Sequence, residues 1–132
     1  MRRIALVVLL VACGHKRADD CAAHGKTVGQ MKWFEDDMKG ALACAQQSKR
    51  PIVVDLWAPW CHTCLSMQST VFTDPSFAAE RDKFVWAALD TDREQNAPAL
   101  QTLSISAWPT FYVLSPDEKV LAQIVGAAIV QQ

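Results

Sequence analysis

The sequence has few of the features expected of a nucleic-acid-binding or membrane-spanning protein. Its 132 residues carry a formal net charge of −1, and basic residues cluster no further than the pairs Arg2-Arg3, Lys16-Arg17 and Lys49-Arg50. No bulk electrostatic attraction to nucleic acid is therefore expected. The apolar run at 4–11 falls well short of the roughly 20 residues of a membrane-spanning helix. There is no repeat and no low-complexity stretch, and a hydrophobic content of 51% argues for one small domain with a real core.

The chain also lacks a second Cys-x-x-Cys pair. It has five cysteines, and only Cys61 and Cys64 are spaced in this way. A structural zinc site usually takes four ligands from two such pairs, so the single pair disfavours zinc. The residues Met31, Met67 and His24 do not form a convincing copper-ligand cluster, and Met67 is better explained as a core residue.

The single cysteine pair directly follows an apolar run. Residues 52–57 read IVVDLW, which predicts a buried strand, and the residues after Cys61 predict a helix. A cysteine at this junction meets unpaired backbone N–H groups and the positive end of the helix dipole, and both favour the thiolate. Cys64 lies about one helical turn further on, close enough to close a disulfide. The pattern therefore indicates thiol–disulfide exchange.

Two segments resemble a known family. Residues 53–64, VVDLWAPWCHTC, are similar to the active-site segment of the thioredoxin superfamily, and Trp108-Pro109-Thr110 resembles its cis-proline loop. Residues 33–126 more closely resemble a subgroup that includes the periplasmic C-terminal domain of the membrane disulfide reductase DsbD and related small lipoproteins. The marks of this subgroup are Trp33, the segment 49–51 and the segment 71–75. The resemblance implies an α/β thioredoxin fold, with a central mixed sheet flanked by helices.

Three residues are expected to carry the chemistry. Cys61 is the expected nucleophile, and Cys64 the resolving thiol that releases the reduced substrate. Asp55 is an acid inside an apolar strand, where burial would raise its pKa. By resemblance it matches the buried aspartate that exchanges a proton with the second cysteine; the alternative is a carboxylate paired with a structural cation. The lysine that the family often places nearby is replaced by Ala88.

The resemblance also implies a substrate-binding surface around the pair. A cis Pro109 would bring the backbone of Trp108 beside Cys61, where it can pair with an extended substrate strand. The alternative is a trans proline that begins an edge strand. His62 would stabilise the thiolate when protonated, or else is a solvated surface residue. The expected substrate-binding residues are Trp60, His62, Trp108, Pro109 and Thr110.

Periodicity predicts strands that alternate with helices and end in a hairpin. Helices are expected at about 33–49, 61–72, 74–81 and 96–103, and strands at 52–57, 84–90, 110–114 and 120–125. This order implies a mixed sheet with helices on both faces. Residues 127–132 are too few to form the C-terminal helix of the thioredoxin fold, so that helix is expected to be short or missing.

The N-terminus resembles a bacterial lipoprotein signal. Arg2-Arg3, the apolar run and the small residues before Cys13 predict a signal peptide at 1–12 and lipidation of Cys13; the alternative is an ordinary secretory signal. A tether is expected at 13–30 and the domain at 31–132. Export would place the protein in the bacterial periplasm, where disulfides persist. The remaining cysteines, Cys21 and Cys44, could form a structural disulfide.

The sequence thus predicts a lipid-anchored periplasmic thiol–disulfide oxidoreductase. Its partners would be exported proteins with disulfides or thiols, an upstream donor or acceptor, and the membrane. No nucleotide or other cofactor is implied, because the cysteine pair carries the electrons. Alternatives are a non-catalytic binding lipoprotein, a metallochaperone that uses Cys61, Cys64 and His62, and an inactive fragment. The residues His62-Thr63 between the cysteines leave both directions of electron flow open.

Overall fold

A computed structural model describes residue 21, residue 25, residues 27–29 and residues 31–127. The expected signal peptide at 1–12, the lipidation site Cys13 and most of the expected tether lie outside the described residues. So do residues 128–132, on which the expectation about the C-terminal helix largely depends.

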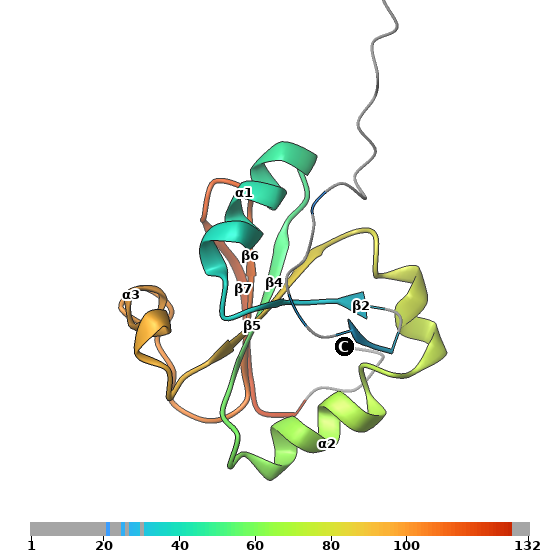
Figure 1. Ribbon diagram of the computed structural model, residues 1–132, viewed down its shortest axis with the longest axis vertical. Helices are drawn as coiled ribbons and strands as arrows, with labels where there is room; N and C mark the ends of the chain where they lie inside the picture. The colour runs from blue at the N-terminus through green and yellow to red at the C-terminus, as the bar shows by residue number, and fades with distance from the viewer. Residues whose placement is uncertain (1–20, 22–24, 26, 30, 128–132) are drawn as a thin grey trace, which may run out of the picture.

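A five-stranded mixed sheet forms the centre of the molecule (Figure 1). Its strands lie in the order β3 (Phe34–Glu35), β5 (Val85–Asp90), β4 (Ile52–Trp57), β6 (Thr110–Leu114) and β7 (Val120–Val125). The first three are parallel, while β6 runs antiparallel to β4 and β7 antiparallel to β6. Every residue of β5 is buried and β4 is nearly so, as expected for central strands covered on both faces.

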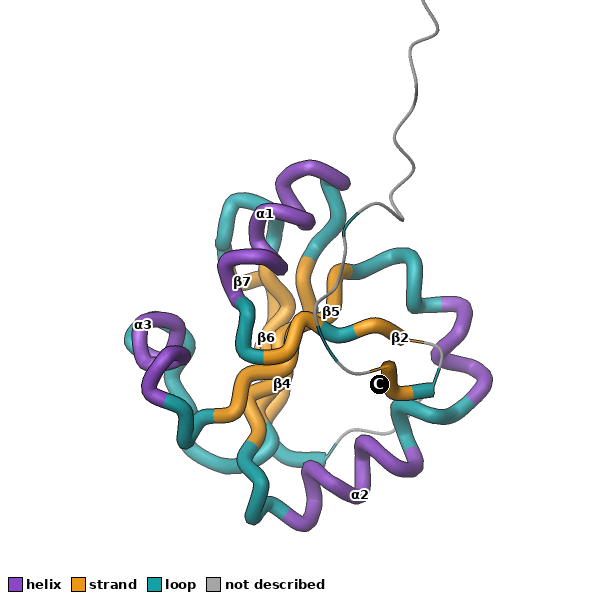
Figure 2. The backbone as a smooth tube through the Cα atoms, in the orientation of Figure 1, coloured by secondary structure: helices purple, strands orange, loops and turns teal. Residues whose placement is uncertain are grey.

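Helices cover both faces of this sheet (Figure 2). α1 (Met38–Ser48) and α3 (Ala97–Leu100) lie on one face, and α2 (His62–Thr70) lies across the other. Short 3₁₀ helices occupy Pro75–Ala79 and Glu94–Asn96. The first core contains side chains of α1 with β4 and β5, and the second contains Met67 of α2 with aromatic side chains. Within the described residues, no helix has both the length and the apolar character needed to cross a bilayer.

The first helix begins later than its sequence pattern predicted. Trp33 does not open it; Trp33 is buried just before β3, and Glu35 belongs to that strand. Asp36 has a left-handed φ of 53°, and Asp37 then caps the helix by accepting a hydrogen bond from the Gly40 N–H. A Cβ at position 40 would collide with that carboxyl group, so a larger residue there would displace the Asp37 cap.

An N-terminal hairpin spans the boundary expected between the tether at 13–30 and the domain at 31–132. β1 (Thr27–Val28) pairs antiparallel with β2 (Met31–Lys32), and Gly29 in the turn has a left-handed φ of 60°. The expected tether therefore ends inside a paired element, whose Met31 is fully buried in the second core. Further upstream, Cys21 forms a disulfide with Cys44 of α1, with Cα atoms 5.4 Å apart.

Candidate active site

The Cys61–Cys64 disulfide lies where β4 passes into α2. Cys61 is the N-cap of α2, and its sulfur accepts a hydrogen bond of 3.1 Å from the Cys64 N–H. The two Cα atoms are 5.3 Å apart. Cys61 is 6% exposed and Cys64 only 1%. In the disulfide form Cys61 is thus less accessible than its expected role suggested, although it is still the more accessible of the two.

The peptide bond between Trp108 and Pro109 is cis. Pro109 is fully buried, and its carbonyl oxygen accepts a hydrogen bond of 2.8 Å from the Gly126 N–H. Thr110, also buried, donates through its hydroxyl to the Ala107 carbonyl at 2.7 Å. Trp108 packs against the small cluster that contains both cysteines. The fold therefore brings the 108–110 loop next to the disulfide.

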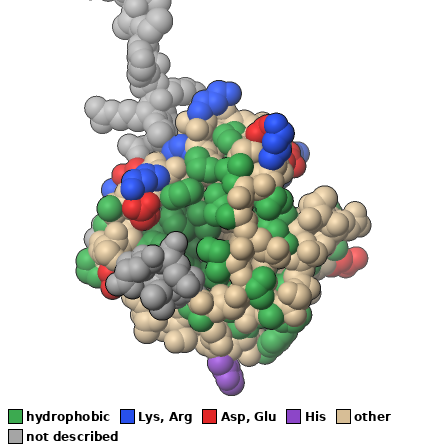
Figure 3. Space-filling view, turned by 180° about the vertical axis from the view of Figure 1, so that it is seen from behind, with side chains coloured by type: hydrophobic (Ala, Val, Ile, Leu, Met, Phe, Trp, Pro, Cys, Tyr) green, Lys and Arg blue, Asp and Glu red, His purple; other side chains and the backbone are tan. Residues whose placement is uncertain are grey.

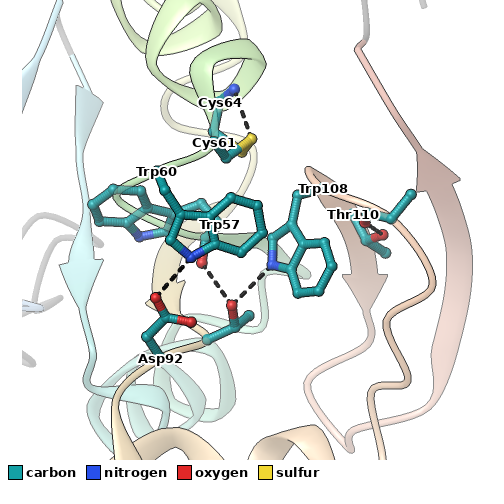
Figure 4. Close-up of a disulfide and its surroundings, with 9 residues drawn as sticks. Trp57, Trp60, Cys61, Cys64, Asp92, Trp108 and Thr110 are labelled. Carbon is teal, nitrogen blue, oxygen red and sulfur yellow. Dashed lines mark hydrogen bonds between the residues drawn. A yellow bond between two sulfur atoms is a disulfide. The ribbon is translucent and has the colours of Figure 1, made fainter.

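Two tryptophans form an aromatic pair beside the disulfide (Figure 4). The rings of Trp60 and Trp108 meet edge to face, with centroids 5.0 Å apart. The Trp60 indole N–H donates to Asp92 and the Trp108 indole N–H donates to the Thr91 hydroxyl, both at 2.8 Å. Trp60 is 56% exposed, so this pair forms a surface that a bound polypeptide can contact. His62, in the first turn of α2, is also exposed.

Thr91 and Asp92 are site residues that the sequence analysis did not identify. They directly follow β5, which lies parallel to and beside β4. Because parallel strands end at the same edge of a sheet, residues just after β5 meet those just after β4. The Thr91 hydroxyl donates to the Trp57 carbonyl at 3.1 Å, which ties the two strand ends together. The sequence did contain a signal for these two site residues, because they are a polar pair directly after the second predicted strand.

Asp55 is buried in the middle of β4. It is 2% exposed, its neighbours in register are Ala88 on β5 and Phe111 on β6, and burial raises its pKa from 3.8 to about 8. Its Oδ1 has no hydrogen-bond partner among the described residues. Ala88 thus does lie beside Asp55, as the sequence comparison with the family implied, and it supplies no charge. The carboxyl group is therefore able to change protonation state near neutral pH.

Within the described residues, no group of three or more histidine, cysteine or acidic side chains is placed to hold a metal ion. Beside the disulfide, the indole N–H groups of Trp60 and Trp108 are hydrogen-bonded to Asp92 and Thr91. The arrangement consists of a disulfide at a helix N-terminus, a cis-proline loop and a buried carboxyl group.

A family model described as thioredoxin-like matches residues 33–116, which include the cysteine pair, Asp55 and the cis-proline loop. The chain belongs to the thioredoxin-like family. The match begins at Trp33 and covers four of the five strands of the sheet; β7 lies beyond it.

Named relatives agree with this family. The thiol:disulfide interchange protein DsbD of Vibrio vulnificus is 32% identical over 77 residues, which are 57% of this chain and 13% of that protein. The thioredoxin of Griffithsia pacifica is 34% identical over 80 residues, which are 61% of this chain and 69% of that protein. The chain thus spans a small part of the length of DsbD.

Solved structures show the same fold. A putative disulphide-isomerase from Bacteroides thetaiotaomicron matches with a TM-score of 0.65 at 23% identity, over 79% of this chain and 86% of that one. A thioredoxin from Thermus thermophilus matches with a TM-score of 0.64 at 23% identity, over 76% and 79%. The thioredoxin-like chain is close to DsbD in sequence and has the thioredoxin fold. Its Cys61–Cys64 disulfide is a group that can undergo thiol–disulfide exchange.

Proposed function

We propose that this protein exchanges disulfides with exported proteins in the bacterial periplasm while a lipid on Cys13 holds it at a membrane. The observation that carries the exchange reaction is the Cys61–Cys64 disulfide at the N-terminus of α2, packed against the cis-proline loop. The lipobox-like segment that ends at Cys13 supports the location, because several acyl chains give durable attachment to a membrane.

The reaction begins with the reduced pair. The Cys61 thiolate attacks one sulfur of a substrate disulfide, forms a mixed disulfide, and releases the other substrate sulfur as a thiolate that takes up a proton. Deprotonated Cys64 then attacks the Cys61 sulfur, which re-forms the Cys61–Cys64 disulfide and releases the second substrate thiolate. Two electrons pass to the substrate. The reverse sequence oxidises a substrate dithiol, so the direction depends on the partner.

Helix α2 supports the assignment of these roles. The N-terminal N–H groups and the helix dipole favour negative charge at the cap position, which Cys61 occupies. The Cys64 N–H already donates to the Cys61 sulfur and would donate to its thiolate in the same way. Cys64 is almost fully buried, so its thiol needs a nearby base before it can attack.

Asp55 is the proposed base for Cys64. Its raised pKa, about 8, allows the carboxylate to take the Cys64 proton and return it near working pH. Desolvation disfavours its charged form, and Ala88 provides no cation that would oppose this effect.

Substrate docking is assigned to the surface around the disulfide. The backbone of Trp108 next to cis-Pro109 would pair with an extended substrate strand, and the Trp60–Trp108 pair offers an apolar contact. His62 and Thr110 flank this region from α2 and β6. Asp92 and Thr91 hold the two indoles in place through their hydrogen bonds.

The test is equilibration with glutathione and a disulfide-containing protein substrate, with thiols trapped by alkylation and counted by mass spectrometry. We expect the Cys61–Cys64 pair to gain and lose two electrons as a unit, and the substrate disulfide to exchange. A potential near −270 mV would assign the protein to the reductants, and one near −120 mV to the oxidants. A pair that stays inert to reduction, or that exchanges with glutathione but with no protein disulfide, would contradict the proposal.

A further inference from the structure

A small cavity lies next to Asp55, on the face of the sheet covered by α2. Its volume is about 10 Å³, and its lining includes Asp55, Ala88, Trp33, Glu35 and Gln68. The volume is at the lower end of the roughly 10–15 Å³ that holds one water molecule. The cavity is therefore of a size for a single water.

Two of the residues that line this cavity each have a buried polar atom. Neither atom has a hydrogen-bond partner among the described residues. They are Asp55 Oδ1 and the indole nitrogen of Trp33. Trp33 is 3% exposed and Asp55 2% exposed. An unpaired buried polar atom costs on the order of 1–3 kcal/mol, and a bridging water satisfies a donor and an acceptor at once. One N–H donor and one carboxyl oxygen are a complementary pair for that water.

The register of three strands places an exposed acid near the same cavity. Ala88 on β5 pairs with Asp55 on β4 on one side and with Glu35 on β3 on the other. Directly paired residues point to the same face, and neighbouring strands are about 4.8 Å apart, so the backbones of Glu35 and Asp55 lie two strand spacings apart, roughly 9.6 Å, with Ala88 between them. The long Glu35 side chain covers part of this span, since Glu35 lines the same cavity as Asp55. Glu35 is exposed and Gln68 of α2 is half-buried, so both reach from the cavity toward solvent.

We propose that this cavity binds one water between the Trp33 indole and the Asp55 carboxyl group, and that this water passes protons between Asp55 and Glu35. Trp33 is then a positioning residue and Glu35 the surface end of a proton path. The inference rests on the proposed function, since it supplies the route by which Asp55 is restored after each exchange.

The protons balance in a closed sequence. The Asp55 carboxylate takes the proton of the Cys64 thiol before Cys64 attacks. The protonated Asp55 gives that proton to the water, which passes one of its own to the Glu35 carboxylate, and Glu35 releases it to solvent. Both carboxylates and the water are regenerated. Among the described cavity-lining residues, Glu35 is the titratable group besides Asp55, while Gln68, Ala88 and the aromatic residues carry no charge.

The water site is tested by NMR on the oxidised protein, without substrate. We expect the Trp33 indole N–H to show a cross-relaxation signal with water, and its chemical shift to follow the titration of the Asp55 carboxyl carbon. Asp55→Asn should remove that dependence. Trp86, whose indole donates to the Arg81 carbonyl at 3.1 Å, is the matched control and should not respond. A Trp33 indole that shows neither the water signal nor the titration overturns the water site.

Two variants should move the Asp55 titration in opposite directions. Trp33→Phe removes the donor that stabilises the carboxylate through the water, so the midpoint should rise. Glu35→Gln removes a neighbouring negative charge, so the midpoint should fall. Glu94→Gln, an exposed acid of the 3₁₀ helix at Glu94–Asn96, is the control and should leave it unchanged. If Trp33→Phe does not fold, the wild-type indole measurement still tests the water site, and the variant at exposed Glu35 still tests the link to Glu35. A midpoint that Glu35→Gln leaves in place overturns the link to Glu35.

Rapid-mixing kinetics test the proton path itself. Glu35→Gln should slow resolution of a mixed disulfide by Cys64 several-fold and leave the first attack by Cys61 unchanged, while Glu94→Gln alters neither step. Equal resolution rates in wild type and Glu35→Gln overturn the path. A protein with the coupled titration but no disulfide exchange would instead contradict the proposed function, so the two failures are distinguishable.

Discussion

Cys61 and Cys64 are the same residue type, but the fold surrounds their sulfurs differently. Cys61 caps α2 and its sulfur accepts a backbone N–H, whereas Cys64 is inside the first turn and 1% exposed. The first environment stabilises a thiolate, and the second shields a thiol from solvent. At the scale of single residues, this difference separates the attacking cysteine from the resolving one.

Cys61 should therefore be the more reactive thiol of the reduced protein. Limited alkylation, followed by peptide mass spectrometry, is expected to label Cys61 first. Preferential labelling of Cys64 would reverse the assignment of roles.

The same difference should appear when partners are trapped. In Cys64→Ser the mixed disulfide cannot be resolved, so adducts with partner proteins should accumulate in cells and be visible on non-reducing gels. In Cys61→Ser none should accumulate. Equal trapping by the two variants would show that the nucleophile is not Cys61.

Asp55 should make stability depend on pH. Its pKa is about 8 in the folded state against an ordinary value of 3.8, so between about pH 4 and pH 8 the native state holds a proton that the unfolded chain has lost. Stability should fall as pH rises through this window. The side chain introduced in Asp55→Asn does not titrate. The free energy of unfolding of this variant should exceed that of wild type only slightly at pH 4, and by on the order of a few kcal/mol at pH 8.

Urea unfolding of both oxidised proteins at pH 4 and pH 8 measures this gain. Asp55→Asn should also leave Cys61 alkylation intact and slow resolution by roughly 10²-fold, the loss typical of a missing general base. A stability difference that is the same at both pH values would show that Asp55 does not hold the extra proton. Wild-type resolution rates across pH 6 to 9 would make Asp55 a structural residue only.

At the scale of elements, the two disulfides lie on opposite faces of the sheet. Cys61–Cys64 lies at the start of α2, while Cys21–Cys44 fixes the upstream segment to α1, where Cys44 belongs to the first core. The second disulfide closes a loop with a sequence separation of 23. Its position, away from the active-site helix, indicates a role in holding the N-terminal hairpin against the domain.

Removal of the Cys21–Cys44 disulfide should lower stability without lowering exchange activity. For a loop of this length the chain-entropy relation gives a loss of about 3 kcal/mol. The double variant Cys21→Ser/Cys44→Ala, unfolded in urea beside wild type, measures the loss, and the glutathione equilibrium of Cys61–Cys64 is the control. Unchanged stability would mean that the hairpin is held by its packing alone, and a changed equilibrium would mean that the two disulfides are coupled.

At the scale of the whole molecule, the surface is not uniformly polar. Figure 3 shows hydrophobic side chains gathered over the middle of one face, with basic and acidic side chains toward one end. The edge strand β7 contributes three exposed large hydrophobic side chains, Val120, Leu121 and Val125. The aromatic pair and His62 lie instead at the end of the sheet where β4 meets α2. Substrate contact is therefore expected at one end of the molecule.

Attachment of the whole molecule to a membrane should depend on Cys13. Fractionation of cells that express wild type should place the protein with membranes, because multiple acyl chains supply the affinity that one chain does not. Cys13→Ala should move it to the soluble periplasmic fraction or leave the precursor uncleaved. A soluble wild-type protein with an unmodified mature terminus would exclude lipidation.

The sequence alone determined the family and the order of the elements from α1 onward. Local signals were sufficient for this: the buried run of β4, the cysteine spacing at a helix start, and Asp74-Pro75, which caps and opens the helix Pro75–Ala79 as expected. Predictions from neighbouring residues are wrong where tertiary contacts determine the secondary structure instead. Residues 33–35 have a helical pattern, yet β3 forms there because its backbone pairs with β5.

Only the tertiary structure decided which distant residues meet. Strand order places the residues after β4 and β5 at one end of the sheet, where Trp60 contacts Asp92 and Trp108. Register places Asp55 and Glu35 on either side of Ala88 in the middle of the sheet, where both line a cavity with Trp33. The tertiary structure also decided how strongly burial raises the pKa of Asp55. An aspartate in an apolar strand suggests a raised pKa, but a value near 8 depends on Ala88 and Phe111 at its sides. Pairing across the sheet joins residues that are distant in the chain. Neither these contacts nor the size of the Asp55 pKa shift therefore follows from residues adjacent in the sequence.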